Sequence, residues 1–392
     1  MATTKATRIA VTPRSFGGQE LYVVDDEQQA ELVRGLTGSA ALTDAQRRSL
    51  EALGFEFDVR PRRPGGRRKR DAERAKQQDG KERVESRARK INEHLTQHVV
   101  VVRQFTRTFP TSNVWVLHDG TEAALIDAGF GDDGCIAARL EYIRKELDGL
   151  RIRHIAITHH HFDHSSGGRR LREALHAETA INPIDAELLH TPTQSNEDLP
   201  DEREIVERAR TWREEALNTP IDLPLADGDE FRVGSLTVRA VHTPGHTAGH
   251  NCYWVPQTGT LFTGDNVLGV GTSAIGPPPS GDMEQYLASL LRMRELQATL
   301  FAPGHGPAVT ATDAKIQELV DHRRTRDRQI IELIDHGYTS DRQLRRAIYP
   351  EIQRGLLRAA RGQIRSHLAR LAGQGDVIVE QGEREWTVAL TR

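Results

Sequence analysis

The sequence predicts an α/β layered fold, and two observations carry this prediction. From His98 onward, short apolar runs alternate with segments of helical length, which is the pattern of alternating strands and helices. Four of the apolar runs end in loops that contain His or Asp beside Gly. The loop at 158–168 has the most of these residues, because five of its eleven residues are His or Asp. We therefore expect a polar site where several strands end.

Length and composition narrow the class of protein. A chain of 392 residues is long enough for two or three domains. Its net charge of -3 gives no overall signal for nucleic acid. The two cysteines, Cys135 and Cys252, are far apart and fit a reducing compartment. We recognise no signal peptide and no run of the ~18 apolar residues that a membrane span needs. A cytoplasmic protein without a membrane partner is expected.

Residues 1–94 are expected to form a small module followed by a basic linker. A strand at 20–24 and helices at 27–36 and 44–53 would make a helical or winged-helix-like module. Seven of the eleven residues at 60–70 are basic and none is acidic. This run either contacts the phosphates of RNA or another polyanion, or is a solvated linker that leads into a charged helix at about 71–93. The linker interpretation is preferred.

The central region, 95–312, supplies the layered fold. Its predicted elements are strands at 99–102, 113–117 and 123–126, a helix at about 133–147, a strand at 155–157, a polar helical insertion between 182 and 225, and strands at 236–241, 260–263 and 300–303. Asp119-Gly120 predicts the hairpin turn between the second and third strands. The insertion is expected to lie beside the site.

The loop after the strand at 155–157 has the spacing of metal ligands. His159 and His161 are two residues apart and can point the same way, whereas Asp163 and His164 can turn toward a second point nearby. Imidazole and carboxylate ligands suit zinc, with iron or manganese as competitors. The alternative is a histidine-rich polar loop without a metal. His160 is expected to point away from the site.

Three later loops complete the pattern. His246, Asp265 and His305 each follow an apolar strand beside Gly, and their convergence with the first loop would surround two cations. Each of the three taken alone is more often a turn residue. Asp127 ends the strand at 123–126, where it either accepts a hydrogen bond from a ligand imidazole or forms an ordinary turn.

The ordered series His-x-His-x-Asp-His, Thr-Pro-Gly-His-Thr, Thr-Gly-Asp and Pro-Gly-His-Gly-Pro resembles the metallo-β-lactamase superfamily from about Val99 to Val309. The resemblance implies an αββα sandwich with a dinuclear zinc site. It assigns the first metal to His159, His161 and His246, the second to Asp163, His164 and His305, and a bridging role to Asp265. Because Asp265 stands where the B1 and B2 lactamases carry a Cys ligand, β-lactams are not the expected substrates.

A narrower resemblance concerns the C-terminal region. Residues 262–272, 303–307 and 315–323 are similar to the beta-lactamase-like protein 2 family. This similarity implies a winged-helix domain at 313–392, with a helix at 359–373 and a wing formed by 377–379 and 386–390. The family includes an RNA-cutting enzyme, and related proteins are thioesterases that release polyketides from acyl carriers. Residues 1–94 have no counterpart in it.

One helix of this region carries a basic stripe, formed by Arg354, Arg358, Arg361 and Arg365. The stripe either binds phosphates of RNA or of a phosphopantetheine arm, or is a solvated face. The solvated face is preferred.

The leading functional hypothesis is a hydrolase in which a hydroxide bridging two zinc ions attacks a small-molecule or carrier-bound thioester or ester. Asp163 would also accept a proton, and no Gly-x-Ser-x-Gly elbow competes with this mechanism. The alternatives are cleavage of single-stranded RNA, an RNA- or protein-binding module with incidental hydrolysis, and a mononuclear iron dioxygenase, which would leave several ligands unused. An oligomer is compatible with the sequence. Asn113, Thr272 and the insertion at 194–222 are candidate substrate contacts by position.

Overall fold

The computed structural model describes residues 8–16, 19–24, 41–42, 56–59, 83–104, 107–108, 112–191, 203–350, 352 and 357–391. The chain divides into two compact units, Met1–Lys81 and Glu82–Arg392. The first unit contains a sheet of strand order β3-β2-β1-β4, with β1 at Arg8–Phe16, β2 at Gln19–Val24, β3 at Ala41–Leu42 and β4 at Glu56–Val59. The predicted strand at 20–24 is confirmed as β2, whereas the helices predicted at 27–36 and 44–53 lie outside the described residues.

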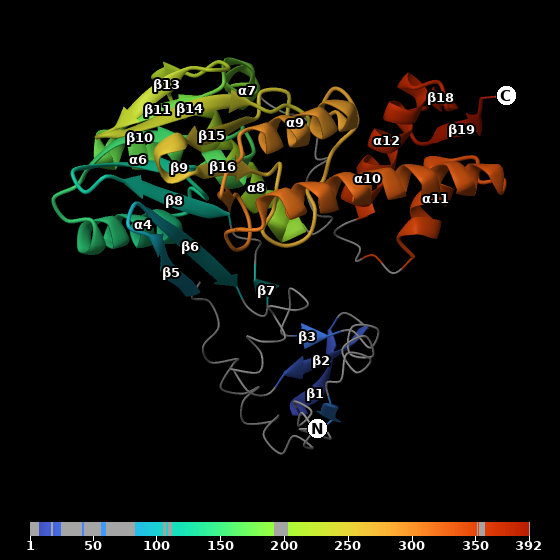
Figure 1. Ribbon diagram of the computed structural model, residues 1–392, viewed down its shortest axis with the longest axis horizontal. Helices are drawn as coiled ribbons and strands as arrows, with labels where there is room; N and C mark the ends of the chain where they lie inside the picture. The colour runs from blue at the N-terminus through green and yellow to red at the C-terminus, as the bar shows by residue number, and fades with distance from the viewer. Residues whose placement is uncertain are drawn as a thin grey trace, which may run out of the picture. The chain divides into compact units, whose positions relative to one another are not determined.

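Two sheets form the centre of the second unit (Figure 1). The first has the order β12-β11-β10-β9-β8-β6-β5, and β7 also pairs with β6. Its strands are β5 (Arg83–Asn92), β6 (Leu95–Gln104), β7 (Arg107–Thr108), β8 (Asn113–His118), β9 (Glu122–Ile126), β10 (Arg151–Ala156), β11 (Glu178–Ile181) and β12 (Leu223–Pro224).

The second sheet has the order β13-β14-β15-β16-β17. Its strands are β13 (Glu230–Val233), β14 (Leu236–His242), β15 (Asn251–Val255), β16 (Thr260–Gly264) and β17 (Leu300–Pro303). The helices of the unit are α4 (Asp133–Glu146), α5 (Phe162–Ser165), α6 (Gly168–Leu175), α7 (Pro183–Leu189), α8 (Arg203–Leu217), α9 (Met283–Glu295), α10 (Thr312–Asp335), α11 (Asp341–Ile348) and α12 (Leu357–Gly373).

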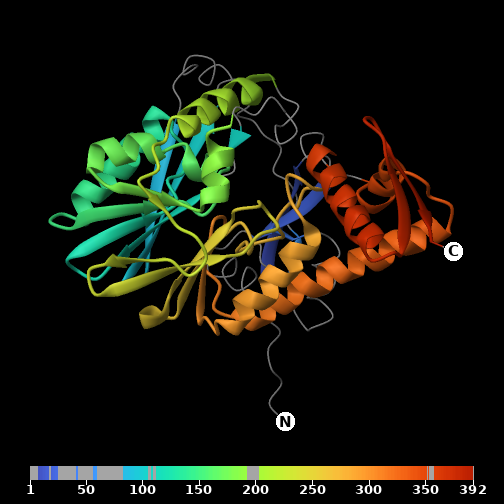
Figure 2. The ribbon, with the colours of Figure 1, turned by 90° about the horizontal axis from the view of Figure 1, so that it is seen from above.

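The alternation of side chains along the strands builds the sandwich. In β8, Trp115 and Leu117 face the second sheet and pack with residues such as Phe262, whereas Val114 and Val116 pack beneath α4. On the other side, α9 and α10 cover the second sheet. Figure 2 shows the two sheets face to face, with green helices outside the first and orange helices outside the second. The predicted αββα order is therefore confirmed.

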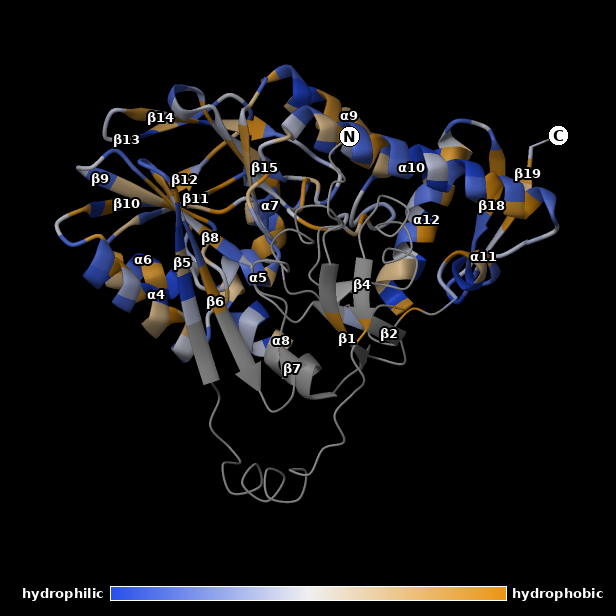
Figure 3. Cartoon of the chain, turned by 60° about the horizontal axis from the view of Figure 1, so that its bottom comes forward, coloured by the Kyte–Doolittle hydropathy of each residue, from blue (hydrophilic) through white to orange (hydrophobic). Residues whose placement is uncertain are grey.

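Hydrophobic residues gather along the strands, and hydrophilic residues are prominent on the helices (Figure 3). This distribution is expected when both sheets are covered by helices. Among the described helices, none combines the length and the hydropathy that crossing a lipid bilayer requires.

Strand β5 contradicts the prediction for its residues. Residues 83–92 form strand β5 and not the end of a charged helix. Their charged run, Arg87 to Lys90, conceals the strand pattern, and the strand forms because the apolar strand β6 offers a free edge for antiparallel pairing. The remainder of that predicted helix and the basic run at 60–70 lie outside the described residues.

The C-terminal region contains the second half of α10, then α11, α12 and an antiparallel pair, β18 (Val377–Gln381) with β19 (Trp386–Leu390). These elements share a core of their own that includes Ile330, Leu344, Ile364 and Val388. The helix predicted at 359–373 and the strand pair are observed. The winged-helix assignment and the boundaries at 94/95 and 312/313 stay predictions.

Part of the predicted basic stripe is engaged within this region. Arg361 Nε and Arg365 Nε donate to the buried carboxylate of Asp341 at 2.8 and 2.6 Å. Arg365 also lies over the ring of Trp386, 5.0 Å from its centroid. Arg361 and Arg365 therefore hold α11 and β19 against α12, whereas Arg354 lies outside the described residues.

Replacing Asp341 by Asn should lower the free energy of unfolding by about 2 kcal/mol at pH 7, because two guanidinium groups lose their charged acceptor. Burial raises the pKa of the Asp341 carboxyl, but Arg361 and Arg365 outweigh burial and lower it. The contribution is then complete above about pH 4 and is lost as the pH falls through the depressed pKa. Urea unfolding should therefore show the difference shrinking in acid. The exposed Asp376→Asn is the control; an equal effect there, or a difference that persists in acid, would contradict this account.

Candidate functional site

The ends of five strands place the predicted site residues at one edge of the sandwich. Asp127 follows β9, residues 158–164 follow β10, and β9 and β10 are parallel neighbours. Asp265 and His305 follow the parallel pair β16 and β17, and His246 lies in the loop between β14 and β15. We call seven of these residues the candidate metal cluster: His159, His161, Asp163, His164, His246, Asp265 and His305. They form overlapping groups whose ligand atoms lie within 4.8 Å of one another.

The first group contains His159, His161 and His246. The Nε2 atoms of His159 and His246 each lie 3.0 Å from Nδ1 of His161. Tetrahedral zinc holds its nitrogen ligands about 3.3 Å from one another, so this spacing fits a cation. Burial lowers the pKa of all three imidazoles, well below the ordinary value for His159 and His161. Neutral imidazoles are the form that binds metal.

The second group contains Asp163, His164 and His305. His164 Nε2 lies 3.3 Å from His305 Nε2, and Asp163 Oδ2 lies 3.4 Å from the former and 3.1 Å from the latter. Burial lowers the pKa of His305, but Asp265 and Asp163 outweigh burial and raise it to about 9. His164 is affected in the same way and its pKa is raised well above the ordinary value. This half of the cluster therefore favours positive charge at its centre.

Asp265 contacts both groups through different oxygens. Its Oδ1 lies 3.4 Å from His164 Nε2 and 3.5 Å from His305 Nε2, whereas Oδ2 lies 3.7 Å from His246 Nε2. Among the described residues, the buried Oδ1 has no hydrogen-bond partner. A buried carboxylate oxygen without a donor, surrounded by imidazole nitrogens, fits a metal ligand.

Asp127 orients His164 of the second group by a hydrogen bond on the side of the ring that faces away from the cluster. Its Oδ2 accepts a hydrogen bond from His164 Nδ1 at 2.9 Å, and its Oδ1 accepts from the backbone N–H and the hydroxyl of Thr158 at 2.8 and 2.9 Å. The tautomer with Nδ1 protonated leaves His164 Nε2 free to face the cluster. Asp127 has a φ of +64°, a conformation that non-glycine residues rarely adopt and that is often found at functional sites.

Asp185 was not identified from the sequence, yet it joins two loops of the cluster. Its Oδ2 accepts hydrogen bonds from His160 N, His160 Nδ1 and Thr247 Oγ1 at 2.9, 3.0 and 2.8 Å, and its Oδ1 accepts from Gly249 N at 2.7 Å. Burial raises the pKa of Asp185, but the hydrogen bonds from His160 outweigh burial and bring it to about 2. His160 points away from the cluster, as expected. No motif marks Asp185, because its partners are distant in sequence.

His250 was also not identified as a site residue from the sequence, although it ends the segment Thr243–His250 that contains His246. The imidazole is buried and stacks on His159 with ring centroids 5.2 Å apart. Its Nε2 accepts a hydrogen bond from the backbone N–H of Asp265 at 3.2 Å. Burial lowers the pKa of His250 to about 3, so the ring stays neutral. It therefore fixes the backbone of the residue that joins the two groups.

The two residues predicted to contact substrate lie in different settings. Asn113 is buried, and its Nδ2 donates to the carbonyls of Pro303 and Gly306, both at 2.8 Å. It therefore holds the turn that carries His305. Thr272 is partly buried and precedes Ser273 and Ala274, which lie against His246. A substrate contact by either residue stays a prediction.

The described part of the predicted insertion packs against the loop at 158–168, which carries four residues of the candidate metal cluster. Trp212 of α8 stacks on Phe162, with ring centroids 5.6 Å apart, and its Nε1 donates to Asp132 Oδ2 at 2.7 Å. Phe162 lies between His161 and Asp163 in the chain, so α8 packs against the segment that carries these ligands. Residues 194–202 of the insertion lie outside the described part.

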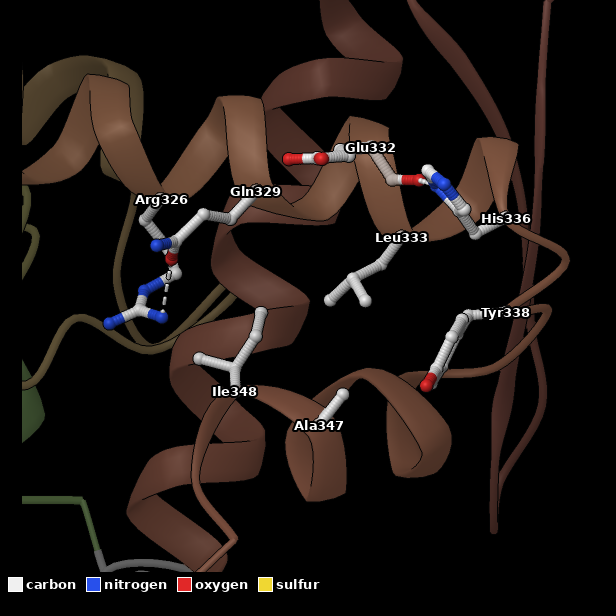
Figure 4. A pocket seen from close by; sticks show the side chains of 8 residues that line it. All are labelled: Arg326, Gln329, Glu332, Leu333, His336, Tyr338, Ala347 and Ile348. Atoms are coloured by element: carbon white, nitrogen blue, oxygen red, sulfur yellow. Dashed lines mark hydrogen bonds between the residues drawn. The ribbon is translucent and has the colours of Figure 1, made fainter.

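A cavity of about 480 Å³ between α10 and α11 does not belong to this site (Figure 4). Leu333, Ala347 and Ile348 form its apolar part, and Arg326, Glu332 and Tyr338 stand around it. None of the cluster residues lines this cavity. This cavity is therefore separate from the candidate metal cluster at the strand ends.

An αββα sandwich with His and Asp side chains gathered at one edge, where they could hold metal ions, defines the class of protein. Residues 107–305, about half of the chain, match the family described as the Metallo-beta-lactamase superfamily. The chain therefore belongs to the metallo-beta-lactamase superfamily.

Individual proteins agree with this assignment. An atrochrysone carboxyl ACP thioesterase of Aspergillus fumigatus is 30% identical over 220 residues, which cover 55% of this chain and 58% of that protein. A beta-lactamase-like protein 2 homolog of Caenorhabditis elegans is 29% identical over 224 residues, 56% of this chain and 64% of its own length. The chain thus spans less than two thirds of either relative. The crystal structure of a metallo-beta-lactamase family protein from Thermus thermophilus shares the fold, with a TM-score of 0.63 at 22% identity over 77% of this chain and 100% of that one.

Replacing Asp185 by Ala should lower the free energy of unfolding of the metal-free protein by about 3 kcal/mol, because four donors, two of them buried, lose their acceptor together. Thermal or urea unfolding of the metal-free protein measures this loss. The exposed Glu187 on the same helix offers the control Glu187→Gln, which should change stability by less than about 0.5 kcal/mol. Similar stabilities for the two variants would show that Asp185 does not join the loops.

Proposed function

We propose that the protein is a dinuclear zinc hydrolase whose substrate is a thioester or ester, carried by a small molecule or by an acyl carrier. The observation that supports two metals is the position of Asp265, whose two oxygens face two different groups of ligands. The ligand types suit zinc. His159, His161 and His246 would hold the first ion, Asp163, His164 and His305 the second, and Asp265 would contact both.

When bound, the two ions would lower the pKa of a water molecule and polarise the carbonyl under attack. The surrounding residues keep His159, His161 and Asp163 in the form that metal binding requires, and they orient His164. Burial keeps His159 and His161 neutral, and Asp127 holds the Nδ1 proton of His164. Burial raises the pKa of Asp163, but His164 and His305 outweigh it and lower the pKa well below the ordinary value, so this carboxylate stays ionised and able to accept hydrogen bonds.

Neither cysteine is suited to act as a nucleophile in place of water. Cys135 and Cys252 are both buried. Burial raises the pKa of the Cys252 thiol to about 12, so it carries almost no thiolate at neutral pH. Water activated at the cluster is therefore the proposed nucleophile.

The acyl substrate is supported by the relative that is named a thioesterase acting on an acyl carrier protein. The cluster itself does not select between carbonyl and phosphorus centres, since both reactions use the same activated water. Single-stranded RNA is therefore the substrate that the experiment must distinguish from a thioester.

Metal analysis of the purified protein should find about two zinc ions per chain, and His161→Ala should lose at least one of them. His160→Ala is a matched control, because the neighbouring imidazole faces Asp185 and not the cluster. It should retain both ions, and hydrolysis should fall by about a hundredfold or more only in His161→Ala. One iron and no zinc in the wild-type protein would contradict the dinuclear zinc proposal.

A side-by-side panel of acyl-CoA, acyl-carrier and single-stranded RNA substrates tests the reaction. The thioesters should release free thiol, this activity should disappear when a chelator removes the metal, and added zinc should restore it. RNA cleavage without thioester hydrolysis would replace the proposal with a ribonuclease. No turnover of any substrate by the zinc-loaded protein would contradict both.

A further inference from the structure

A three-residue segment after β16, Ser273–Ile275, lies against one histidine of the first group. His246 Nδ1 donates a hydrogen bond to the carbonyl oxygen of Ala274 at 3.0 Å, and Ser273 Oγ lies 3.4 Å from the same nitrogen. A protonated Nδ1 leaves the Nε2 lone pair to face His161. The carbonyl of Ala274 therefore sets both the tautomer and the rotation of the His246 ring.

The residues on either side of Ala274 are held by the C-terminal helices. Arg323 of α10 donates from Nη2 to the carbonyl of Ser273 at 2.7 Å, and Gln363 Oε1 of α12 accepts from the backbone N–H of Ile275 at 3.0 Å. Arg323 is 1% exposed and Gln363 is 7% exposed, so water does not compete for either contact. Ala274 is thus fixed from both sides.

Arg323 is itself anchored beside the site. Its guanidinium lies over the ring of Tyr286, 5.1 Å from the centroid, and the Tyr286 hydroxyl donates to the carbonyl of Asn266 at 2.9 Å. Asn266 follows Asp265 directly. Arg323 therefore contacts the segment that lies against His246. Through Tyr286, it also supports the backbone of Asn266, the residue that follows Asp265.

We propose that Arg323 and Gln363 are positioning residues for metal binding, which act on His246 through the backbone of Ser273–Ile275. The proposal rests on the proposed function in one respect, namely that His246 binds a metal. Both residues lie beyond the segment 107–305 that matches the family, so the C-terminal region supplies part of the support of the metal site. Loss of either contact would free the Ala274 carbonyl to shift, and the His246 ring would lose its fixed orientation.

If Gln363 only held the C-terminal region in place, loss of any other contact between these parts would affect zinc binding equally. Gln374 offers a matched control for this alternative. Gln374, in the same C-terminal region, donates to Glu284 of α9 at 3.3 Å, and this contact is exposed. This contact joins the C-terminal region to α9, which covers the second sheet, but it does not involve Ser273–Ile275. A change there removes one contact between these parts without disturbing the support of His246.

The test uses the full chain freed of metal and titrated with zinc against a chromophoric chelator. Gln363→Met, which keeps the length of the side chain and removes the acceptor, should weaken the binding of one zinc ion by about tenfold. Gln363→Glu keeps an acceptor oxygen and should bind within about threefold of the wild type, and Gln374→Met should bind like the wild type. Unfolding of each metal-free variant shows whether the fold is retained.

Arg323→Lys provides a second, independent variant, because lysine keeps the charge but not the guanidinium geometry. Arg323→Lys should weaken the binding of the same zinc ion, whatever its effect on the stability of the metal-free protein. Unchanged zinc affinity in Gln363→Met would overturn the proposal, and so would an equal loss in Gln374→Met. A wild-type protein that binds no metal would overturn both this proposal and the proposed function. A protein that binds zinc but hydrolyses no thioester would overturn the substrate assignment alone.

Discussion

The carboxylate of Asp265 is the contact on which both halves of the candidate metal site depend. One oxygen faces His164 and the other faces His246, so a small displacement would separate the two groups. The preceding residue, Gly264, has a φ of +47°, and a Cβ there would lie 2.5 Å from His250 Nε2 and 2.8 Å from the side chain of Thr158. Only glycine permits this turn and this close approach. The end of β16 is therefore constrained by backbone geometry as well as by chemistry.

The two groups of the cluster differ in charge: the first favours neutral imidazoles, and the second favours positive charge. The first gathers imidazoles that would repel one another if protonated, and burial keeps them neutral. The second surrounds His164 with the carboxylates of Asp163, Asp127 and Asp265, and these hold positive charge in a buried position. A bound cation would suit both halves, because it would take the place of the proton that the second half favours and would give the imidazole lone pairs of the first half a common partner. This complementarity explains why neutral and charged ligands stand side by side.

The sequence predicted the candidate cluster because its residue types are uncommon and each follows an apolar strand. It did not reveal Asp185 or His250, because their partners lie on other elements and only the folded chain brings them together. Strand β5 was mistaken for a helix for a related reason: its charges hide the alternation, and pairing with β6 decides its conformation. Asn113 was predicted as a substrate contact from position alone, and this contact stays a prediction; its amide holds the turn that carries His305, a role that the sequence did not reveal. Local patterns therefore identify ligands better than they identify the groups that hold the ligands.

The continuity of α10 bears on where the catalytic part of the chain ends. Its first half packs on the second sheet through Ile316 and Leu319, and its second half enters the C-terminal core through Ile330 and Ile334. A helix that belongs to two cores does not provide the flexible linker that usually separates domains. Arg323 lies between these halves, where its guanidinium meets the carbonyl of Ser273. The boundary predicted at 312/313, which stays a prediction, falls at the start of a helix that packs in both cores. The proposed role of Arg323 and Gln363 would make the C-terminal region a support of the candidate metal cluster as well as a unit with a core of its own.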